Sequence, residues 1–425
     1  MTGNLFPEVN HSKKRRKLLK KSVLFLDTEH AIYMKSPLKV APIRPEILAI
    51  ETQQIMQVST LAMDDPEVIA MWYGESDVST PDFICAAATE ALQRGQTFYT
   101  HKWGIPKLRE TLAAYTCDLY GVDVSTNRVT VTSSGMTGIM ILMQALVGLG
   151  DNIILVDPIW PNGGSAAQVM GGEVRRVSLE ANSQGNWHLD LEKLFAATDS
   201  RTRMIFINSP GNPTGWMVES DQQKEILNFC RNHRIWIVAD EVYSRLVYDR
   251  RVAPSFLEIA EPEDPVVVVN SFSKSWAMTG WRLGWLTHPE RLKEKIGDLI
   301  EYNTSGTPEF LQEAGITAVR DGEDTVTNMI ERCRAGRDAA SCRLSAMNRV
   351  TYSPPAAAFY AFFKVDGIDN SLDFAKCLAT EYKLGVAPGT AFGPSGEGWL
   401  RICFAQSTDR IDEAMNRLEH AMVKV

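Results

Sequence analysis

Apolar residues between positions 128 and 287 fall into short runs, each followed by a polar loop or a helical pattern. The run from Val266 to Val269 is unbroken. Such runs are typical of strands buried on both faces of a parallel sheet, because helices cover both sides. The pattern predicts strands at residues 128–132, 152–156, 204–208, 235–239, 266–270 and 281–287.

Helical spacing fills the segments between these strands. A helix is expected over residues 220–232, because Ser220 or Asp221 can cap its N-terminus and apolar residues recur on one face. Another helix is expected at about residues 137–147. The alternation of strand and helix predicts an α/β fold with a large domain built on a mostly parallel sheet.

The C-terminal segment has a different pattern. A long helical pattern extends from about residue 323 to 343, and short strands are expected at residues 359–363 and 399–404. This predicts a smaller α+β domain, which residues 42–71 are expected to join. We therefore divide the chain into a basic, disordered extension (1–33), an N-terminal arm with part of the small domain (34–75), a large domain (76–322) and a small C-terminal domain (323–425).

The composition favours an enzyme that acts on small molecules. The chain has 425 residues, 44% of them hydrophobic, and a formal net charge of −8. The acidic excess argues against a nucleic-acid partner, whose binding needs basic residues that displace counterions from phosphates. The seven cysteines show no C-x-x-C pair and no histidine at zinc-ligand spacing, so we expect reduced thiols and no metal site.

The N-terminal segment carries the one charge anomaly, a basic run at residues 13–17. The apolar stretch behind it, residues 23–26, is too short for a signal peptide or a membrane span. The run is either a nuclear or nucleic-acid-binding signal, or a solvated extension, or a consequence of a start codon upstream of the functional one at Met34. We expect a cytoplasmic protein without a membrane partner.

The candidate chemistry lies in the loops after the predicted strands, because ligands of open parallel sheets bind beyond the carboxyl ends of the strands. The loop after residues 266–270 contains Lys274. A desolvated lysine flanked by other cations is less protonated, and its neutral amine can attack an aldehyde to form an imine. A lysine taken alone is usually a solvated surface residue. The neighbouring loops favour the chemical interpretation.

Three other loops carry groups suited to an aromatic heterocycle. Asp240 ends the apolar strand at residues 235–239, where a buried carboxylate needs a partner such as a protonated pyridine nitrogen; a helix N-cap or a metal ligand is an equal alternative. Asn212, in a tight turn, and Tyr243 can each donate a hydrogen bond to a phenolate oxygen. Trp160 can stack on a flat ring, with core packing as the alternative.

A segment of small and polar residues begins one of the predicted helices. Gly135, Met136 and Thr137 lie at the helix N-terminus, where free backbone N–H groups and the helix dipole favour a phosphate. This signal is weak on its own. The hydroxyl of Ser271 and the forked guanidinium of Arg282 would complete such an anion site.

Together these loops resemble the fold-type I pyridoxal-phosphate enzymes, specifically the class I/II aminotransferases with the aspartate-aminotransferase fold. The most specific elements are residues 271–274, Ser-Phe-Ser-Lys, and residues 278–284, Met-Thr-Gly-Trp-Arg-Leu-Gly. The resemblance extends from about Pro42 to the C-terminus. It implies a large domain with a mostly parallel seven-stranded sheet between helices, a smaller α+β domain, and pyridoxal 5′-phosphate as the cofactor.

The resemblance also implies a role for each site residue. Lys274 would hold the cofactor as a Schiff base and move the substrate's α-proton, with Asp240 at the pyridine nitrogen and Tyr243 at the ring oxygen. The other implied cofactor contacts are Gly135, Met136, Thr137, Trp160, Asn212, Ser271 and Arg282. The implied substrate contacts are Gly74, Trp160, Asn212 and Arg401, with Arg401 binding the carboxylate.

Tyr99 matches a tyrosine that reaches the phosphate of the neighbouring subunit in this family, so the resemblance implies a homodimer with shared active sites. The chain also departs from the family pattern. Residues 101–103 are His-Lys-Trp where relatives often have Pro-Pro-Ala, so the substrate pocket is expected to differ. No residue stands out as a distal arginine for a dicarboxylate, which leaves aspartate specificity unsupported.

The predicted function is the transfer of an amino group from an L-amino acid to a 2-oxo acid in a two-step exchange, with glutamate and 2-oxoglutarate as one pair. A carbon–sulfur β-lyase is the alternative, because this fold supports several reactions. Release of pyruvate or ammonia without a 2-oxo acid would distinguish it. A regulatory ligand sensor with a DNA-binding domain is the third hypothesis, although residues 1–33 are too few for a winged helix.

Overall fold

The computed structural model describes residues 42–424. The chain divides into two compact units, Met1–Leu48 and Ala49–Val425. Of the first unit only residues 42–48 are described, with the short helix α2 (Pro45–Leu48). The predicted extension at residues 1–33 and the alternative start at Met34 lie outside the described residues. No helix in the described part is long and apolar enough to cross a membrane.

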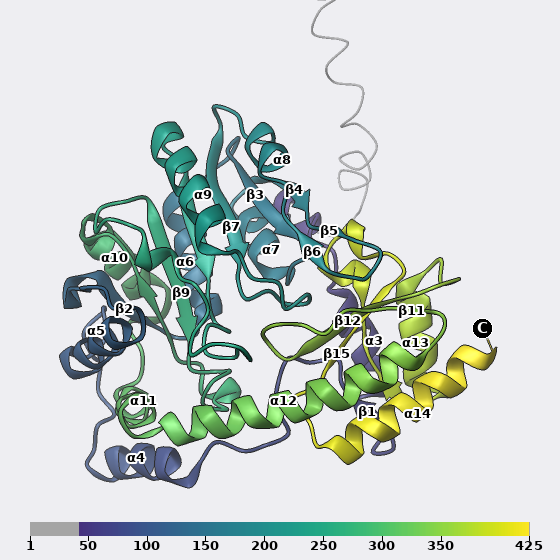
Figure 1. Cartoon of the computed structure of the whole chain (residues 1–425). Helices are drawn as coiled ribbons and strands as arrows, with labels where there is room; N and C mark the ends of the chain where they lie inside the picture. The colour runs from purple at the N-terminus through teal and green to yellow at the C-terminus, as the bar shows by residue number, and fades with distance from the viewer. Residues whose placement is uncertain (1–41, 425) are drawn as a thin grey trace, which may run out of the picture. The chain divides into compact units, whose positions relative to one another are not determined.

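A seven-stranded sheet forms the centre of the second unit (Figure 1). Its strand order is β2-β10-β9-β8-β7-β3-β4, and β10 is antiparallel to both of its neighbours while the other neighbouring pairs are parallel. The strands are β2 (Val129–Thr132), β3 (Asn152–Asp157), β4 (Glu173–Ser178), β7 (Thr202–Asn208), β8 (Trp236–Asp240), β9 (Val266–Ser271) and β10 (Gly284–Thr287). The predicted seven-stranded, mostly parallel sheet is confirmed.

Helices cover both faces of this sheet. In β3, Ile153 and Leu155 belong to one apolar cluster with α6 and α10, whereas Ile154 and Val156 belong to another with α8 and α9. Because neighbouring side chains of a strand point to opposite faces, burial on both sides explains the continuous apolar runs in the sequence. The helices of this part are α4 (Asp82–Gln93), α5 (Pro106–Tyr120), α6 (Gly135–Leu146), α7 (Asn162–Val169), α8 (Leu191–Ala196), α9 (Ser220–His233), α10 (Lys293–Thr304) and α11 (Glu309–Asp321).

A smaller four-stranded sheet lies in the C-terminal part of the chain. It is antiparallel, with the order β11 (Val350–Thr351), β12 (Tyr360–Val365), β15 (Trp399–Cys403) and β14 (Ala387–Pro388). The helices here are α12 (Glu323–Ala346), α13 (Ser371–Glu381) and α14 (Thr408–Lys424). Figure 1 shows α12 as the long green helix, which contacts α11 at one end of its path and α14 and β12 along it. The predicted smaller α+β domain is confirmed.

An N-terminal segment packs with these C-terminal elements. Helix α3 (Gln54–Ala62) contacts α13, and the short strand β1 (Ile69–Ala70) pairs in parallel with β13 (Leu384–Gly385). Ile55 and Val58 of α3 belong to the same apolar cluster as the C-terminal sheet. The sequence led us to expect this association of residues 42–71, and α3 and β1 show it. The domain limits stay a prediction.

Two strands of the large sheet differ from the sequence prediction. The last strand, expected at residues 281–287, begins only at Gly284, because a 3-10 turn at Thr279–Trp281 and a left-handed Arg282 (φ 55°) precede it. The edge strand β4 was not predicted at all. Its sequence, Glu-Val-Arg-Arg-Val-Ser, is mostly polar because an edge strand with exposed residues carries little of the core. Two very short strands, β5 (Glu180–Ala181) and β6 (Trp187–His188), form a separate hairpin.

Candidate active site

A cavity of about 480 Å³ lies where the carboxyl ends of the large sheet's strands meet the C-terminal sheet. Asn208, Asp240 and Ser271 are the last residues of β7, β8 and β9, and they line it from one side. Tyr360 and Arg401, on β12 and β15, line it from the other. Adjacent parallel strands end at the same sheet edge, so their terminal side chains converge on one cavity.

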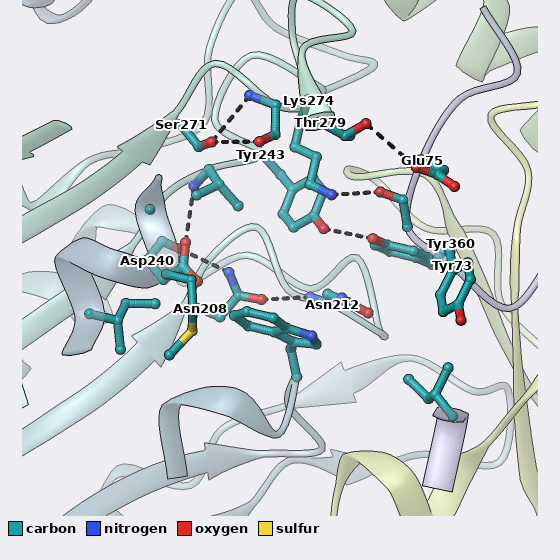
Figure 2. A pocket seen from close by; sticks show the side chains of 18 of the residues that line it. Tyr73, Glu75, Asn208, Asn212, Asp240, Tyr243, Ser271, Lys274, Thr279 and Tyr360 are labelled. Atoms are coloured by element: carbon teal, nitrogen blue, oxygen red, sulfur yellow. Dashed lines mark hydrogen bonds between the residues drawn. The ribbon is translucent and has the colours of Figure 1, made fainter. Parts of the chain in front are cut away.

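Lys274 projects into this cavity (Figure 2). Its amino group donates a hydrogen bond of 2.5 Å to the carbonyl oxygen of Gly74, and it lies 5.6 Å from the ring centroids of both Tyr243 and Phe359. Desolvation lowers the pKa of Lys274 from 10.5 to about 8. Roughly a tenth of the amine is therefore uncharged at pH 7, which makes it a usable nucleophile and base.

Asp240 is a buried carboxylate on the floor of the cavity. Its side chain accepts a hydrogen bond of 3.3 Å from the backbone N–H of Val242, and burial raises its pKa from 3.8 to about 7. The carbonyl oxygen of Asp240 accepts a 2.9 Å bond from the side-chain amide of Asn208. The backbone is thus held in place, while the carboxylate lacks an ion-pair partner within the described residues.

Arg401 is a buried cation at the opposite wall. Its guanidinium group donates to the Asn212 side-chain oxygen over 3.1 Å and to the carbonyl oxygen of Trp72, and it stacks 4.5 Å from the ring centroid of Tyr360. Within the described chain, Arg401 Nε has no hydrogen-bond partner and no carboxylate forms an ion pair with this residue. A buried cation without an anion calls for a negatively charged ligand.

A pair of tyrosine side chains also lines the cavity. The Tyr243 and Tyr360 oxygens are 2.6 Å apart, and both side chains are buried (Figure 2). The two rings meet edge to face at 5.7 Å. Burial raises the pKa of both hydroxyls, so both stay protonated through the neutral range. Tyr243 is therefore a hydrogen-bond donor within the cavity.

The N-terminus of α6 forms one end of the cavity. Gly135 and Met136 line it, and the first N–H groups of a helix have no intrahelical acceptor. Gly284 allows β10 to pass close by, because a Cβ there would lie 2.6 Å from the Gly135 nitrogen. Ser271 and the exposed Arg282 complete this end. Together they form a hydrogen-bonding, positively charged site for an anion.

Most of the residues selected from the sequence meet in this one cavity. The lining includes Gly74, Gly135, Met136, Trp160, Asn212, Asp240, Tyr243, Ser271, Lys274, Arg282 and Arg401. Thr137 lies on the same helix turn, but its hydroxyl donates to the carbonyl oxygen of Ser133 and it does not line the cavity. Tyr99 is 89% exposed and lines a separate surface pocket with Phe98 and Phe310.

Other lining residues were not selected from the sequence. Asn208 ends a predicted strand. Its position at the carboxyl end of that strand could have identified it as a lining residue. Its side-chain oxygen accepts from the Asn212 N–H over 2.7 Å, which fixes that loop. Tyr360 lies within a predicted strand. The alternation of apolar and polar residues there indicates which side chains are buried, but not which of them face a ligand. The remaining unselected residues are Gln53, Ile55, Met56, Trp72, Tyr73, Glu75, Ile139, Val242, Ser273 and Thr279.

Comparison with known proteins agrees with this arrangement. Residues 66–418 match the family described as "Aminotransferase class I and II". This chain belongs to that family. The resemblance inferred from the sequence is confirmed, and the protein is an enzyme of the aminotransferase class. Enzymes of this class generally depend on pyridoxal phosphate.

The relatives of this aminotransferase include enzymes with different named substrates. It is 34% identical over 383 residues to an aspartate aminotransferase of Pyrococcus horikoshii, covering 89% of this chain and 97% of that protein. It is 32% identical over 378 residues to aromatic-amino-acid aminotransferase 2 of Thermococcus litoralis, covering 88% and 96%. The solved aspartate aminotransferase of Thermotoga maritima has a TM-score of 0.82 at 31% identity, covering 89% and 99%. The aspartate-aminotransferase fold is thereby confirmed.

Among residues 42–424, no group of three His, Cys, Asp or Glu side chains is arranged to hold a metal ion. The seven cysteines are all free.

Proposed function

We propose that this aminotransferase moves the amino group of an L-amino acid to a 2-oxo acid in two half-reactions, with pyridoxal 5′-phosphate held as a Schiff base on Lys274. Glutamate and 2-oxoglutarate are proposed as one substrate pair. The observation that carries the proposal is the arrangement around one cavity of a lysine with a lowered pKa, a buried carboxylate and a buried arginine, the last two without ion-pair partners in the described chain.

The residues present fit this cofactor. The buried carboxylate of Asp240, which has no ion-pair partner in the described chain, suits a protonated pyridine nitrogen, and the Trp160 side chain, which lines the same cavity, suits a flat ring. Tyr243 and Asn212 offer hydrogen bonds to the ring oxygen. The phosphate would lie at Gly135, Met136, Ser271 and Arg282, with Thr137 on the same helix turn. When bound, the cofactor supplies an electron-accepting ring that Asp240 keeps cationic.

The protein's own groups divide the remaining work. Arg401 would bind the substrate's α-carboxylate through its fork of N–H groups, and its unpartnered Nε leaves a donor for that purpose. Gly74 would close over the carboxylate from the other side. Lys274, released from its covalent bond, would take the proton from the substrate's α-carbon, because its pKa near 8 suits proton transfer close to neutral pH. The second half-reaction uses the same groups in the reverse order.

We also propose a homodimer in which Tyr99 reaches the phosphate site of the neighbouring subunit. The adjacent Phe98 and Tyr99 side chains are 79% and 89% exposed, and large exposed aromatic side chains are typical of contact surfaces. Size-exclusion chromatography with light scattering tests this proposal, and a fully active monomer would contradict it. We also propose a cytoplasmic location, and domain limits at residues 1–33, 34–75, 76–322 and 323–425.

The visible absorption spectrum of the cofactor-loaded protein tests the proposed function. An imine band is expected, which fades on addition of glutamate or another amino acid donor and returns on addition of 2-oxoglutarate. A band that no donor converts, together with release of pyruvate or ammonia from a single amino acid, would favour the β-lyase alternative. A protein without any such band, even with added cofactor, would exclude the assignment of Lys274.

A further inference from the structure

Tyr360 lines the cavity and contacts three other site residues, but it has no role in the proposed function. Its hydroxyl lies 2.6 Å from that of Tyr243, and its ring lies under the guanidinium group of Arg401 at 4.5 Å. Its hydroxyl also packs against the backbone of Gly74, where a Cβ would collide with it. Tyr360 thus touches one residue proposed to bind the cofactor and two proposed to bind the substrate's carboxylate.

The number of protons decides the direction of the hydrogen bond between the two tyrosines. Each phenol carries a single O–H donor. In the proposed function Tyr243 donates its proton to the ring oxygen of the cofactor, so the same proton cannot be donated to Tyr360. A separation of 2.6 Å between two oxygens requires a proton between them, because it is a hydrogen-bond distance. That proton must then come from Tyr360.

We propose that Tyr360 is a positioning residue whose hydroxyl donates to the Tyr243 oxygen and thereby directs the Tyr243 proton to the cofactor's ring oxygen. The proposal rests on the proposed function, because it requires a ring oxygen at Tyr243. In this proposal the Tyr360 hydroxyl contacts neither the cofactor nor the substrate. It acts through Tyr243.

The surroundings of Tyr360 hold its hydroxyl in this position. The ring packs edge to face with Tyr243 at 5.7 Å and with Phe359 at 4.9 Å, and Arg401 covers its face. Within the described chain, Tyr243 is the one hydrogen-bond partner of the Tyr360 hydroxyl. Burial keeps the pKa of both hydroxyls above the ordinary value, so both protons are present when the enzyme works.

A donated hydrogen bond makes the receiving hydroxyl a stronger donor in its turn. Stronger donation from Tyr243 draws negative charge from the ring oxygen, and the nitrogen that links Lys274 to the cofactor becomes a weaker base. Removal of the Tyr360 hydroxyl therefore raises the pKa of that nitrogen. The absorption of the loaded protein reports this pKa directly, without any turnover.

The experiment is a pH titration of the visible absorption band in the cofactor-loaded protein. In Tyr360→Phe the ring under Arg401 is kept, and the titration midpoint is expected to rise by about half a pH unit. In Tyr243→Phe the rise is expected to be larger, and adding Tyr360→Phe to it should give no further rise, because the intermediary is gone. Tyr248→Phe is the matched control. Tyr248 belongs to the same buried apolar cluster as Tyr360, but its hydroxyl donates to the carbonyl oxygen of Ala358, so the midpoint of Tyr248→Phe should match the wild type.

The outcomes separate this inference from the proposed function. If the wild type shows the band and Tyr360→Phe titrates with the same midpoint, the inference is overturned and the proposed function is not. An equal rise from Tyr360→Phe in the presence and absence of the Tyr243 hydroxyl would also overturn it, because Tyr360 would then act independently of Tyr243. The absence of any band in the wild type would overturn the proposed function and this inference together.

Discussion

The amino group of Lys274 donates its hydrogen bond to the carbonyl oxygen of Gly74, 200 residues earlier in the chain. The two residues belong to the sets proposed to bind the cofactor and the substrate, respectively. The bond ties the amino group of Lys274 to a backbone carbonyl in the lining of the same cavity. The proposed nucleophile is therefore held in one orientation by a hydrogen bond, which reduces the entropy that must be lost on reaction.

Lys274→Ala is expected to abolish the covalent link to the cofactor and to lower turnover by about a thousandfold or more, because nucleophile and proton carrier are lost together. The measurement is the visible spectrum combined with steady-state rates. Lys295→Ala is the control, since this exposed lysine on α10 pairs with Asp298 and lies outside the cavity lining, so the spectrum and the rates should both stay unchanged. Near-normal turnover in Lys274→Ala would contradict its proposed role.

Arg401→Lys is expected to lower kcat/KM by about a hundredfold, because a lysine keeps the charge but cannot bind a carboxylate through two parallel N–H groups. Substrate concentration series at constant pH provide the measurement. The cofactor spectrum of the unreacted enzyme should stay close to that of the wild type. A variant that lost its cofactor band while keeping normal substrate saturation would show that Arg401 has a different role.

The buried carboxylate of Asp240 is expected to make the stability of the cofactor-free protein depend on pH. Its pKa is raised from 3.8 to about 7 by burial, so the folded state binds the proton more tightly than the unfolded state, and stability falls as pH rises from about 4 through 7. In the proposed function, pairing with a cationic ring would remove this penalty. The rise in melting temperature caused by added cofactor should therefore be larger at pH 7.5 than at pH 5. Asp240→Asn should show no such increase.

The buried side chain of His288 is expected to make the folded protein less stable in acid. It is buried between Thr130, whose hydroxyl lies 2.8 Å from its Nε2, and the carbonyl oxygen of Pro289, and desolvation lowers its pKa from 6.5 to about 4. The unfolded state binds the proton more readily, so stability falls by about 3 kcal/mol as pH drops from 6.5 to 4. Urea unfolding of His288→Asn over this range should show a shallower slope. His188→Gln, an exposed histidine, should retain the wild-type slope.

Gly74→Ala is expected to lower kcat/KM by about tenfold or more, because the added Cβ would collide with the Tyr360 hydroxyl and displace one of the two. Removing that hydroxyl makes room. The double variant with Tyr360→Phe should recover part of the loss, as measured by KM for the amino acid substrate. Identical losses in the single and double variants would mean that the two residues do not meet in the working enzyme.

The convergence of the site could be predicted from the sequence because the relevant positions follow from sheet geometry. Asp240 and Ser271 end neighbouring parallel strands, and strand ends at one edge necessarily lie close together. Lys274 and Arg282 followed from their distinctive motif. The start of β10 was placed too early because the left-handed conformation of Arg282 is a tertiary effect without a local sequence signal.

Tyr360 and Thr137 illustrate what the sequence does not encode locally. Tyr360 occupies an antiparallel strand, where alternation predicts which residues are buried but not which of them face a ligand. Thr137 lies beside Gly135 and Met136, but its hydroxyl is drawn to the Ser133 carbonyl oxygen by the helix turn itself. Side-chain direction within a turn depends on such competing bonds, and spacing alone does not resolve it.

The walls of the cavity come from both sheets: the residues proposed to hold the cofactor lie mainly on the large sheet, and Arg401, proposed to bind the substrate, lies on the other. A ligand that bridges them stabilises the assembled arrangement by mass action and leaves the opened one unaided. Cofactor supply would then regulate how long the enzyme survives in a cell: a well-supplied population resists proteolysis, and a starved one is degraded in proportion to how often the C-terminal sheet separates.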